Sequence, residues 1–451
     1  MSKLDSFKAY DVRGRVPDEL DETFAYDIAR AYAAFVKPRR VAVGYDIRLS
    51  SPALAAAVRR GLQDSGSDVL DIGLWGTVGS YFAAFAEGLD GGIMVTASHN
   101  PPDYNGMKFV REQARPVSAD TGLKDMRALI ESGRLPPKAA KRGSERSLDI
   151  RPKYLEHLLG YVSGKTLSKL KVVVNPGNGG AGLIIDALEP HLPFEFVKVN
   201  NNPDGHFPHG VPNPMLEENR AATADVVRRE HADVGLAWDG DYDRCFFFDE
   251  AGHFIEGYYL VGLLAETFLK KEPGARIVHD PRLTWNTLDI VARCGGKAVL
   301  CKSGHAFIKQ KMREADAAYG GEMSAHHYFR RFGYCDSGMI PWLLVLGVIS
   351  ERGQPLSALV GERIRLYPAS GEINRRLSTD TASILARVRA HYESRARTVD
   401  LTDGLSMEFA DWRFNLRGSN TEPLVRLNVE SRGNEPLMRE KTAEVLKIVD
   451  G

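Results

Sequence analysis

Three carboxylates stand close together in one stretch of the chain. Asp239, Asp241 and Asp243 occupy alternate positions directly after the apolar run 234–238. Like charges at this spacing repel one another unless a proton or a cation intervenes. Carboxylate oxygens suit Mg²⁺ and Ca²⁺, and Mg²⁺ readily adds phosphate oxygens to its ligands. These residues, the aspartate triad, therefore predict a divalent cation site with a phosphorylated partner; a solvated acidic loop is the ordinary alternative.

The same D-x-D-x-D pattern also begins an EF-hand calcium loop, and Glu250 falls at the twelfth position of such a loop. The sixth position is Arg244, however, where the calcium loop requires glycine. The next residues, 245–248, are an apolar run typical of a strand. An EF-hand is therefore disfavoured, and so is zinc, which prefers cysteine and histidine ligands.

A second stretch presents a potential nucleophile. Residues 91–109 read GGIMVTASHNPPDYNGMKF, in which the apolar start predicts a buried strand and the prolines predict a loop. Ser98 lies on this loop, followed by His99 and, ten residues later, by Lys108. A hydroxyl with an imidazole and an ammonium nearby is typical of an activated nucleophile. Taken alone, the stretch fits an ordinary serine turn equally well.

Other polar loops could bind anions or hydroxyls. Residues 417–421 offer a guanidinium, two hydroxyls, an amide and backbone N–H groups, which together could hold a phosphate dianion. Glu322 and Ser324 could accept hydrogen bonds from a sugar. Both are ordinary loops if taken alone, and the neighbouring pair His326–His327 lacks a second pair for a metal site. The glycine turn 175–180 lacks a Walker lysine and the GxGxxG spacing, so tight packing is favoured over phosphate binding.

Strands and helices alternate along most of the chain, as in layered α/β domains. The basic, proline-containing stretch 134–151 predicts a surface connection after the first domain. The expected helices are 22–36, an alanine-rich helix capped by Ser50 and Ser51, 78–87, one starting at Ala181, 217–231, 258–270, 284–293, 336–352 and 382–392. The expected strands include 40–48, 68–74, 194–199, 276–280, 297–302, 407–414 and 424–430.

Length and charge narrow the class of protein. A chain of 451 residues is too long for one hydrophobic core. Lys+Arg and Asp+Glu are equal at 59 each, so no overall field attracts nucleic acid or an acidic membrane. The four cysteines lack CxxC or Cys/His metal spacing, and no apolar run of signal-peptide or membrane-span length occurs. We expect a cytoplasmic protein that binds neither nucleic acid nor membrane.

Together these loops resemble the α-D-phosphohexomutases, closest to bacterial phosphomannomutases and phosphoglucomutases. Residues 96–101 (TASHNP) are similar to that family's phosphoserine loop, 239–244 (DGDYDR) to its metal loop, 321–324 (GEMS) to its sugar-binding loop and 417–423 to its phosphate-binding loop. The resemblance implies three related α/β domains plus a C-terminal α+β domain around a central cleft. We place them at 1–147 (phosphoserine), 148–251 (metal loop), 252–366 (sugar binding) and 367–451 (phosphate binding).

The resemblance also implies a role for each residue that matches a family motif. Ser98 would carry a phosphoryl group and complete a Mg²⁺ site with Asp239, Asp241 and Asp243, with a hexose 1,6-bisphosphate as intermediate and activator. Expected catalytic residues besides Ser98 are Arg13, His99, Lys108 and His326, with His326 and Arg13 favoured as general acid and base. Expected substrate-binding residues are Tyr10, Arg244, Arg282, Lys302, Glu322, Ser324, His326, Arg417, Ser419, Asn420 and Thr421. Arg282 stands where some family members have lysine, and it keeps the charge without the proton-transfer capacity.

The expected reaction is the interconversion of mannose 6-phosphate and mannose 1-phosphate. Glucose phosphates are expected as further substrates, because mannose and glucose differ only at carbon 2, and a phosphoglucomutase as main activity stays open. A metal-dependent sugar phosphatase and a non-catalytic sugar-phosphate binding protein are the alternatives from other classes. We expect a monomer. The sequence leaves open the preferred sugar, the general acid and base, the oligomeric state, the pathway and whether Ser98 is phosphorylated.

Overall fold

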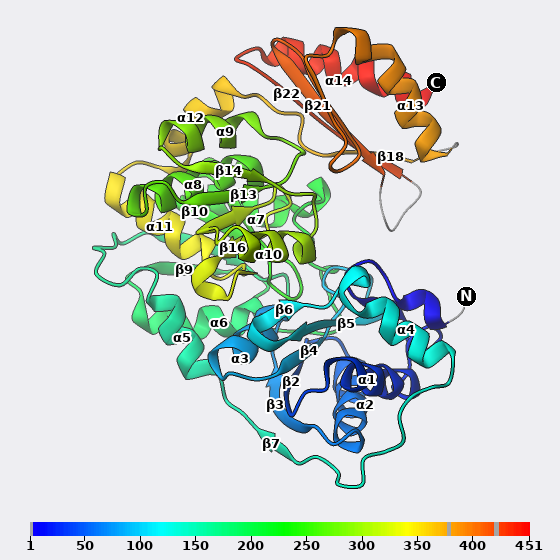
Figure 1. The fold of residues 1–451 in the computed structure, drawn as a ribbon. Coiled ribbons are helices and arrows are strands. Elements are labelled where there is room, and N and C mark those ends of the chain that lie inside the picture. Colours follow the sequence, from blue (N-terminus) through cyan, green and yellow to red (C-terminus); the bar gives the residue numbers. More distant parts are fainter. Residues whose placement is uncertain (1–2, 377–379, 419–423) are drawn as a thin grey trace. The chain divides into compact units, whose positions relative to one another are not determined.

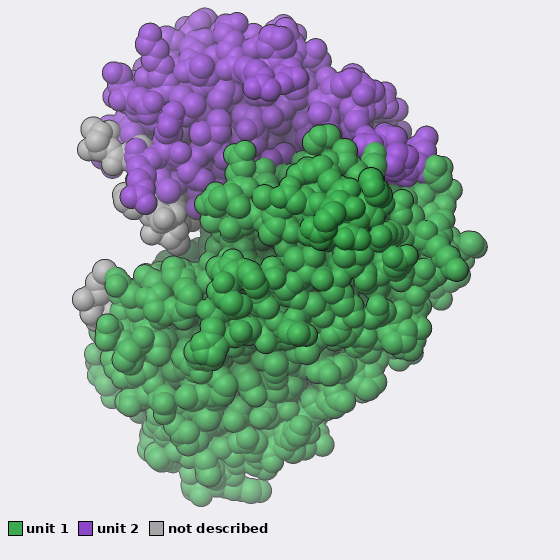
Figure 2. All heavy atoms as spheres, turned by 180° about the vertical axis from the view of Figure 1, so that it is seen from behind, with its two compact units in different colours: residues 1–254, 326–353 green, residues 255–325, 354–451 purple. Residues whose placement is uncertain are grey.

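The computed structural model describes residues 3–376, 380–418 and 424–451. Contacts divide the chain into two compact units (Figure 2). Unit 1 comprises Met1–Phe254 and His326–Gly353, and unit 2 comprises Ile255–Ala325 and Gln354–Gly451.

The first part of unit 1 is a seven-stranded sheet in the order β1-β5-β4-β2-β3-β7, with β6 paired to β5. The central strands β4, β2, β3 and β7 are parallel, whereas β5 and β1 add in antiparallel fashion. Parallel strands are covered on both faces, and β2 accordingly buries Val41, Ala42 and Val43 completely. The strands are β1 (Val12–Arg15), β2 (Arg40–Tyr45), β3 (Asp68–Leu74), β4 (Gly91–Val95), β5 (Tyr104–Arg111), β6 (Arg115–Pro116) and β7 (Glu145–Ser147).

Helices cover this sheet (Figure 1). One apolar core joins the sheet to α1 (Glu22–Val36), α2 (Ser51–Asp64) and α4 (Leu123–Glu131). α3 (Thr77–Ala86) packs against β2, β4 and β5 without joining that core. The ends of α1 follow common capping chemistry: Asp21 accepts a hydrogen bond from the Phe24 N–H, and Lys37 closes the helix in the left-handed conformation.

A five-stranded sheet in the order β12-β11-β10-β8-β9 follows. Its strands are β8 (Lys171–Asn175), β9 (Glu195–Lys198), β10 (Val234–Trp238), β11 (Cys245–Phe248) and β12 (Phe254–Ile255), and its helices are α5 (Arg151–Leu159), α6 (Ala181–Leu188) and α7 (Ala221–Glu230). The hairpin β16 (His327–Phe329) and β17 (Cys335–Asp336) and the buried helix α11 (Pro341–Arg352) complete unit 1.

Unit 2 contains the parallel strands β13 (Arg276–His279), β14 (Lys297–Leu300) and β15 (Tyr319–Gly321). Its helices are α8 (Gly257–Lys271), α9 (Trp285–Arg293), α10 (His305–Glu314) and α12 (Leu356–Leu366). Its C-terminal part is an antiparallel sheet in the order β18-β22-β21-β20-β19 (Figure 1). These strands are β18 (Ile373–Arg376), β19 (Thr398–Asp400), β20 (Leu405–Glu408), β21 (Trp412–Gly418) and β22 (Leu424–Ser431), packed against α13 (Thr381–Tyr392) and α14 (Glu435–Asp450).

Four local expectations were wrong. The strand expected over 40–48 ends at Tyr45, so Asp46 and Arg48 lie in the loop after β2. Asp336 lies in β17 and α11 begins only at Pro341, because proline is suited to the first position of a helix. The expected strand 407–414 is two strands, β20 and β21, because the chain reverses where the Phe409 N–H bonds the Trp412 carbonyl. Ser50 precedes α2 but makes no side-chain cap.

Among the described residues, no single helix is long and apolar enough to cross a membrane. The helices α11 and α12 reach that length and composition only together, and the chain breaks between them.

Candidate active site

Two strand ends of unit 1 carry the reactive groups that the sequence pointed to. Ser98 lies on the loop 96–103 between β4 and β5, here called the serine loop. The aspartate triad lies on the loop 239–244 between β10 and β11, here called the metal loop. The two loops meet because Ser98 Oγ donates a hydrogen bond of 3.1 Å to Asp239 Oδ2.

Glycine packing holds the metal loop in place. A Cβ atom added at Gly180 would lie 2.7 Å from the Tyr242 ring, and one added at Gly179 would lie 3.1 Å from the Gly240 carbonyl oxygen. Real Cβ atoms essentially never show the first distance, and the second is tighter than nine in ten real Cβ contacts. The glycine turn 175–180 therefore packs tightly against the metal loop, as the sequence favoured.

The aspartate triad fits a metal ion. Its three carboxylates are buried, and one ligand oxygen from each lies within 4.8 Å of the others. In the described part of the chain, no donor forms a hydrogen bond with the buried Asp241 Oδ1 or Asp243 Oδ1. Buried carboxylate oxygens without donors are costly unless a cation binds them, and oxygen ligands of this kind suit Mg²⁺ or Ca²⁺.

The pKa values in the triad reflect this crowding. Burial raises the pKa of Asp243 well above its ordinary value, and the charge of Asp241 raises it further. Burial also raises the pKa of Asp239, although Arg244 opposes the shift. Asp241 behaves differently: burial acts upward, but Lys108 holds its pKa below the ordinary value.

Lys108, on β5, supplies a fixed positive charge. Its Nζ atom lies 2.8 Å from Asp241 Oδ2 and 2.6 Å from Asp243 Oδ2. The side chain is only 5% exposed, and the two carboxylates raise its pKa even though burial acts in the opposite direction. Thr77, at the start of α3, donates to Asp241 and accepts a 3.0 Å hydrogen bond from Lys108. Lys108 therefore stays charged beside the triad.

His99 and Arg244 lie next to Ser98. His99 Nδ1 is 3.0 Å from Ser98 Oγ and 2.6 Å from an Arg244 terminal nitrogen. Because a guanidinium can only donate, His99 Nδ1 accepts from Arg244 and the ring proton belongs on Nε2. Burial, followed by the charge of Arg244, lowers the pKa of His99 well below its ordinary value. His99 is therefore a neutral supporting group, and the Ser98 hydroxyl donates to Asp239 instead.

The N-terminal segment brings Arg13 to the serine loop. Arg13 Nε donates to Asp11 at 2.8 Å, and its terminal nitrogen bonds the Asn100 side chain. Asp11 and Asp241 raise the pKa of Arg13 against the opposing effect of burial. Tyr10 lies half-buried in the bend before β1.

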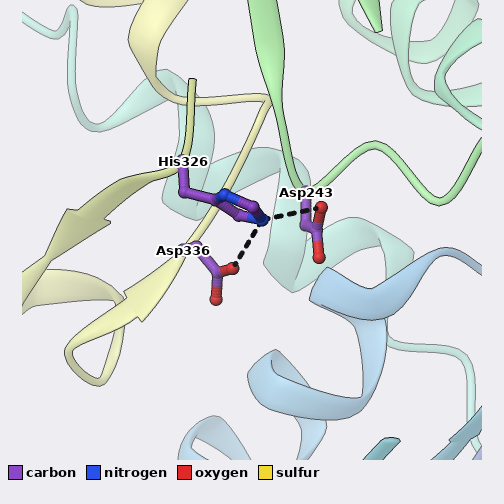
Figure 3. A group of neighbouring side chains, drawn as sticks. All are labelled: Asp243, His326 and Asp336. Carbon is purple, nitrogen blue, oxygen red and sulfur yellow. Dashed lines mark ion pairs between the residues drawn. The ribbon is translucent and has the colours of Figure 1, made fainter. Parts of the chain in front are cut away.

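His326 lies between two carboxylates (Figure 3). Its Nε2 atom is 3.6 Å from Asp243 Oδ1 and 3.8 Å from Asp336 Oδ2. An isolated antiparallel bridge joins the backbones of His326 and Arg244. His326 therefore joins the metal loop to β17, which carries Asp336.

Unit 2 holds a separate group of expected site residues around Arg282. Asp280 accepts hydrogen bonds from the Arg282 backbone N–H and from its Nε and terminal nitrogen. Arg282 also donates to Ser324 Oγ at 3.2 Å, and Glu322 lies 3.7 Å away. Arg413 donates to the Arg282 carbonyl at 3.0 Å and so fixes the backbone of this loop.

A second arginine reaches the same group through Glu372. Glu372 lies 3.4 Å from Arg282, 3.1 Å from Arg417 and 3.6 Å from Arg426. Burial acts to raise the pKa of Glu372, but the three arginines hold it below its ordinary value. One carboxylate thus contacts three guanidinium groups, and of these Arg282 also pairs with Asp280 and Glu322.

The remaining expected residues are more scattered. Lys302 is exposed, with its Nζ atom 3.4 Å from the centre of the Phe307 ring. Glu322 is buried and accepts a 2.8 Å hydrogen bond from the Gly304 N–H. Ser419, Asn420 and Thr421 lie outside the described residues.

Sequence reasoning did not single out Thr77, Asp336 or Glu372. Each is an isolated polar residue whose neighbours in the sequence give no motif, and Asp336 was expected in a helix. The only available signal was position, because Thr77 begins a helix just after the strand β3.

Comparison with known proteins gives one consistent result along the chain. Models of phosphoglucomutase/phosphomannomutase alpha/beta/alpha domains I, II and III match residues 4–134, 152–252 and 256–367, and the C-terminal domain model matches 372–448. A phosphomannomutase of Salmonella montevideo is 59% identical over 100% of both chains. A protein named phosphohexose mutases from Xanthomonas campestris pv. campestris is 58% identical over 99% of this chain and 100% of its own. A phosphoglucomutase/phosphomannomutase family protein of Burkholderia thailandensis superposes with a TM-score of 0.88 at 31% identity, covering 100% of this chain and 98% of its own.

Proposed function

Because the chain belongs to the phosphoglucomutase/phosphomannomutase family, we propose that it is a phosphomannomutase that interconverts mannose 6-phosphate and mannose 1-phosphate. The observation that carries this proposal is the buried contact between Ser98 Oγ and Asp239 in the aspartate triad. A hydroxyl held against three carboxylates needs a cation there before it can bear a phosphate dianion.

Ser98 carries the phosphoryl group in this proposal. The bond between Ser98 Oγ and phosphorus breaks, and a bond forms between phosphorus and the free hydroxyl oxygen of the hexose phosphate. The product is a hexose 1,6-bisphosphate, which turns end for end and returns its other phosphoryl group to Ser98. Phosphoryl transfer needs little covalent help but much charge neutralisation and positioning.

In this proposal, different residues of unit 1 neutralise charge and transfer the proton. Lys108 and Arg244 stay charged and neutralise the transferring group, and Arg13 does the same because a guanidinium stays protonated in proteins. This favours an electrostatic role for Arg13 over proton transfer. His326 is then the group that takes the proton from the attacking sugar hydroxyl and returns it in the reverse step.

Asp239, Asp241, Asp243 and Ser98 would hold Mg²⁺. This ion supplies Lewis-acid charge neutralisation at the transferring phosphoryl oxygens. Mg²⁺ suits the site because it uses few protein ligands and adds phosphate oxygens readily.

The residues of unit 2 would bind the substrate. Arg417 and Arg282 carry the positive charge suited to the phosphate that does not react. Glu322 and Ser324 present acceptors for the 3- and 4-hydroxyls in both orientations of the bisphosphate. Because mannose and glucose share these hydroxyls, we propose glucose phosphates as further substrates.

A coupled assay tests this proposal. The purified protein with Mg²⁺ and a trace of glucose 1,6-bisphosphate is expected to convert mannose 1-phosphate and glucose 1-phosphate into the 6-phosphates. Free phosphate is measured in the same samples. Free phosphate released as fast as substrate disappears would identify a phosphatase instead, and no turnover of either sugar would refute the mutase.

A further inference from the structure

Ser98 has an unusual backbone. Its φ angle is +51°, in the left-handed region that residues other than glycine seldom adopt. The residue is also 4% exposed, so its backbone groups must find partners inside the protein. Strained backbone of this kind persists only where surrounding groups fix it.

Arg48 makes the most extensive contacts with the serine loop. It lies between β2 and α2, and its side chain is 1% exposed. One terminal nitrogen donates to the Ser98 carbonyl at 3.0 Å and to the Asn100 carbonyl at 2.6 Å. The other donates to the Pro101 carbonyl at 2.7 Å and to the Tyr104 carbonyl at 2.9 Å. A single guanidinium thus binds carbonyl groups from Ser98 to Tyr104, the first residue of β5.

A second path reaches the other backbone group of Ser98. The Ser98 N–H donates to Thr96 Oγ1 at 3.0 Å, and Thr96 Oγ1 donates to Asp46 Oδ2 at 2.7 Å. Asp46 is fixed in turn, because its Oδ1 accepts from the Arg48 N–H at 3.0 Å and from Ser51. Both the N–H and the carbonyl of Ser98 are therefore tied to the strand end after β2.

We propose that Arg48 is a positioning residue for phosphoryl transfer, which holds the Ser98 backbone so that Oγ stays aimed at the aspartate triad. This inference rests on the proposed function. Arg48 acts through four main-chain carbonyls and touches no reacting atom. Its loss lets the serine loop relax from the left-handed conformation, and a displacement of about 1 Å at a reacting group costs about 10²-fold in rate.

Lysine cannot replace Arg48. A guanidinium is planar and presents donors in two directions, whereas an ammonium is a single point with three donors. Lysine at this position keeps the charge but cannot span carbonyl groups from Ser98 to Tyr104. The substitution R48K therefore separates the geometry from the charge.

The test compares R48K, T96V and the matched control R40K. Arg40 is exposed, and within the described residues its side chain donates only to the Gly88 carbonyl. R40K therefore makes the same chemical change away from the serine loop. Phosphorylation of Ser98 by glucose 1,6-bisphosphate is followed by intact mass in a rapid-quench series, and mannose 1-phosphate affinity is measured by calorimetry. R48K is expected to slow phosphoryl uptake about 10²-fold with the dissociation constant within threefold of the wild type. T96V is expected to slow uptake about tenfold, and R40K to leave it unchanged.

Uptake by R48K within threefold of the wild type would overturn the proposal. So would a rate loss that is matched by weaker substrate binding, because Arg48 would then support the fold in general. If R48K does not fold, T96V decides alone: normal uptake by T96V overturns the proposal and slowed uptake with normal binding supports it. A wild-type protein that carries no phosphoryl group on Ser98 either before or after the incubation would instead refute the proposed mutase function.

Discussion

Asp239 shows how much of the site depends on single carboxylate oxygens. Its Oδ2 accepts from Ser98 Oγ and from Arg244 Nε at 2.8 Å, and its Oδ1 accepts from the Arg244 N–H at 3.2 Å. All three partners donate. An amide nitrogen at either oxygen position would face a donor.

We therefore expect D239N to reduce kcat by about 10²-fold or more, which is the effect that losing one preorganised charge-stabilising group has in other enzymes. Mg²⁺ affinity measured by calorimetry should fall with it, and EDTA should abolish wild-type turnover. The control is D186N, because Asp186 forms an exposed ion pair with Lys198. A D239N protein that binds Mg²⁺ and turns over like the wild type would remove Asp239 from the site.

Arg417 tests the assignment of unit 2. A lysine keeps the charge but loses the planar fork that matches a phosphate. R417K is expected to raise KM for mannose 1-phosphate about tenfold with a smaller change in kcat, because it weakens binding of the phosphate that does not react. R439K, at an exposed helix pair with Glu435, should leave both constants unchanged. Steady-state kinetics checks this, and a fall in kcat with unchanged KM would contradict it.

Among the single residues of the site, the sequence pointed to those that belong to motifs and missed those that do not. Ser98 and the aspartate triad stood out because reactive groups were concentrated at apolar strand ends. Arg48 and Asp46 also follow a strand end, but one arginine near one aspartate is common in sequences. The role proposed for Arg48 depends on hydrogen bonds to carbonyl groups some 50 residues further along the chain, which the local sequence does not reveal. Their roles, like those of the other site residues, stay predictions.

Elements with a strong apolar pattern were predicted well. The helix 22–36 was confirmed at both ends, and the strand 68–74 likewise. Short elements set by tertiary contacts were not found: β17 has two residues, and the turn that separates β20 from β21 lies inside a stretch that alternates apolar and charged residues as a strand does. Such reversals depend on what packs against them, which a local pattern does not contain.

Gly76, which precedes α3, provides a test at the scale of an element. A Cβ atom there would lie 2.3 Å from the Asp241 carbonyl oxygen and 2.4 Å from the Tyr242 ring. G76A is therefore expected to displace the metal loop, to lower the free energy of unfolding by about 1–3 kcal/mol and to reduce Mg²⁺ affinity.

The matched control is G361A in α12. The nearest atom to a Cβ at Gly361 is the Arg365 terminal nitrogen at 3.6 Å, an ordinary contact. Because alanine favours a helix more than glycine does, G361A should stabilise by about 0.5–1 kcal/mol. Chemical denaturation measures the free energy of unfolding of both variants, G76A and G361A. A G76A protein as stable and as active as the wild type would show that the contact at the start of α3 is not needed.

The whole molecule should respond to acid through His157. This side chain lies among aromatic rings, with ring centres 5.6 Å from Phe82 and Phe332 and 5.4 Å from Tyr161. Burial, followed by the charge of Arg331, lowers the pKa of His157 from 6.5 to about 4.

The direction of this pH dependence follows from proton binding in the two states. Between pH 6.5 and 4 the unfolded chain binds a proton at His157 that the folded chain does not, so the free energy of unfolding falls as the pH falls. H157F removes this proton and keeps the ring packing. Urea denaturation between pH 7 and 4 should therefore give a flatter pH dependence for H157F than for the wild type, with equal activity at pH 7. If the free energies of unfolding of H157F and the wild type changed with pH in parallel, His157 would not be a source of the acid sensitivity.

The whole-molecule organisation was predictable to the level of the family and the fold class. Both are confirmed by the four domain matches, which cover nearly the whole chain. The predicted boundaries at residues 147, 251 and 366 stay predictions, as does the monomeric state. Boundaries of this kind depend on contacts between distant segments, and helix or strand patterns alone do not fix them.

The most direct test of the central claim is the intact mass of the protein before and after incubation with glucose 1,6-bisphosphate and Mg²⁺. The wild type is expected to gain the mass of one phosphoryl group, to lose it again when a hexose 1-phosphate is added, and to carry it on the peptide that contains Ser98. S98A is expected to gain nothing. A wild-type protein that interconverts mannose phosphates without ever carrying phosphate on Ser98, or an S98A variant with full activity, would contradict the account.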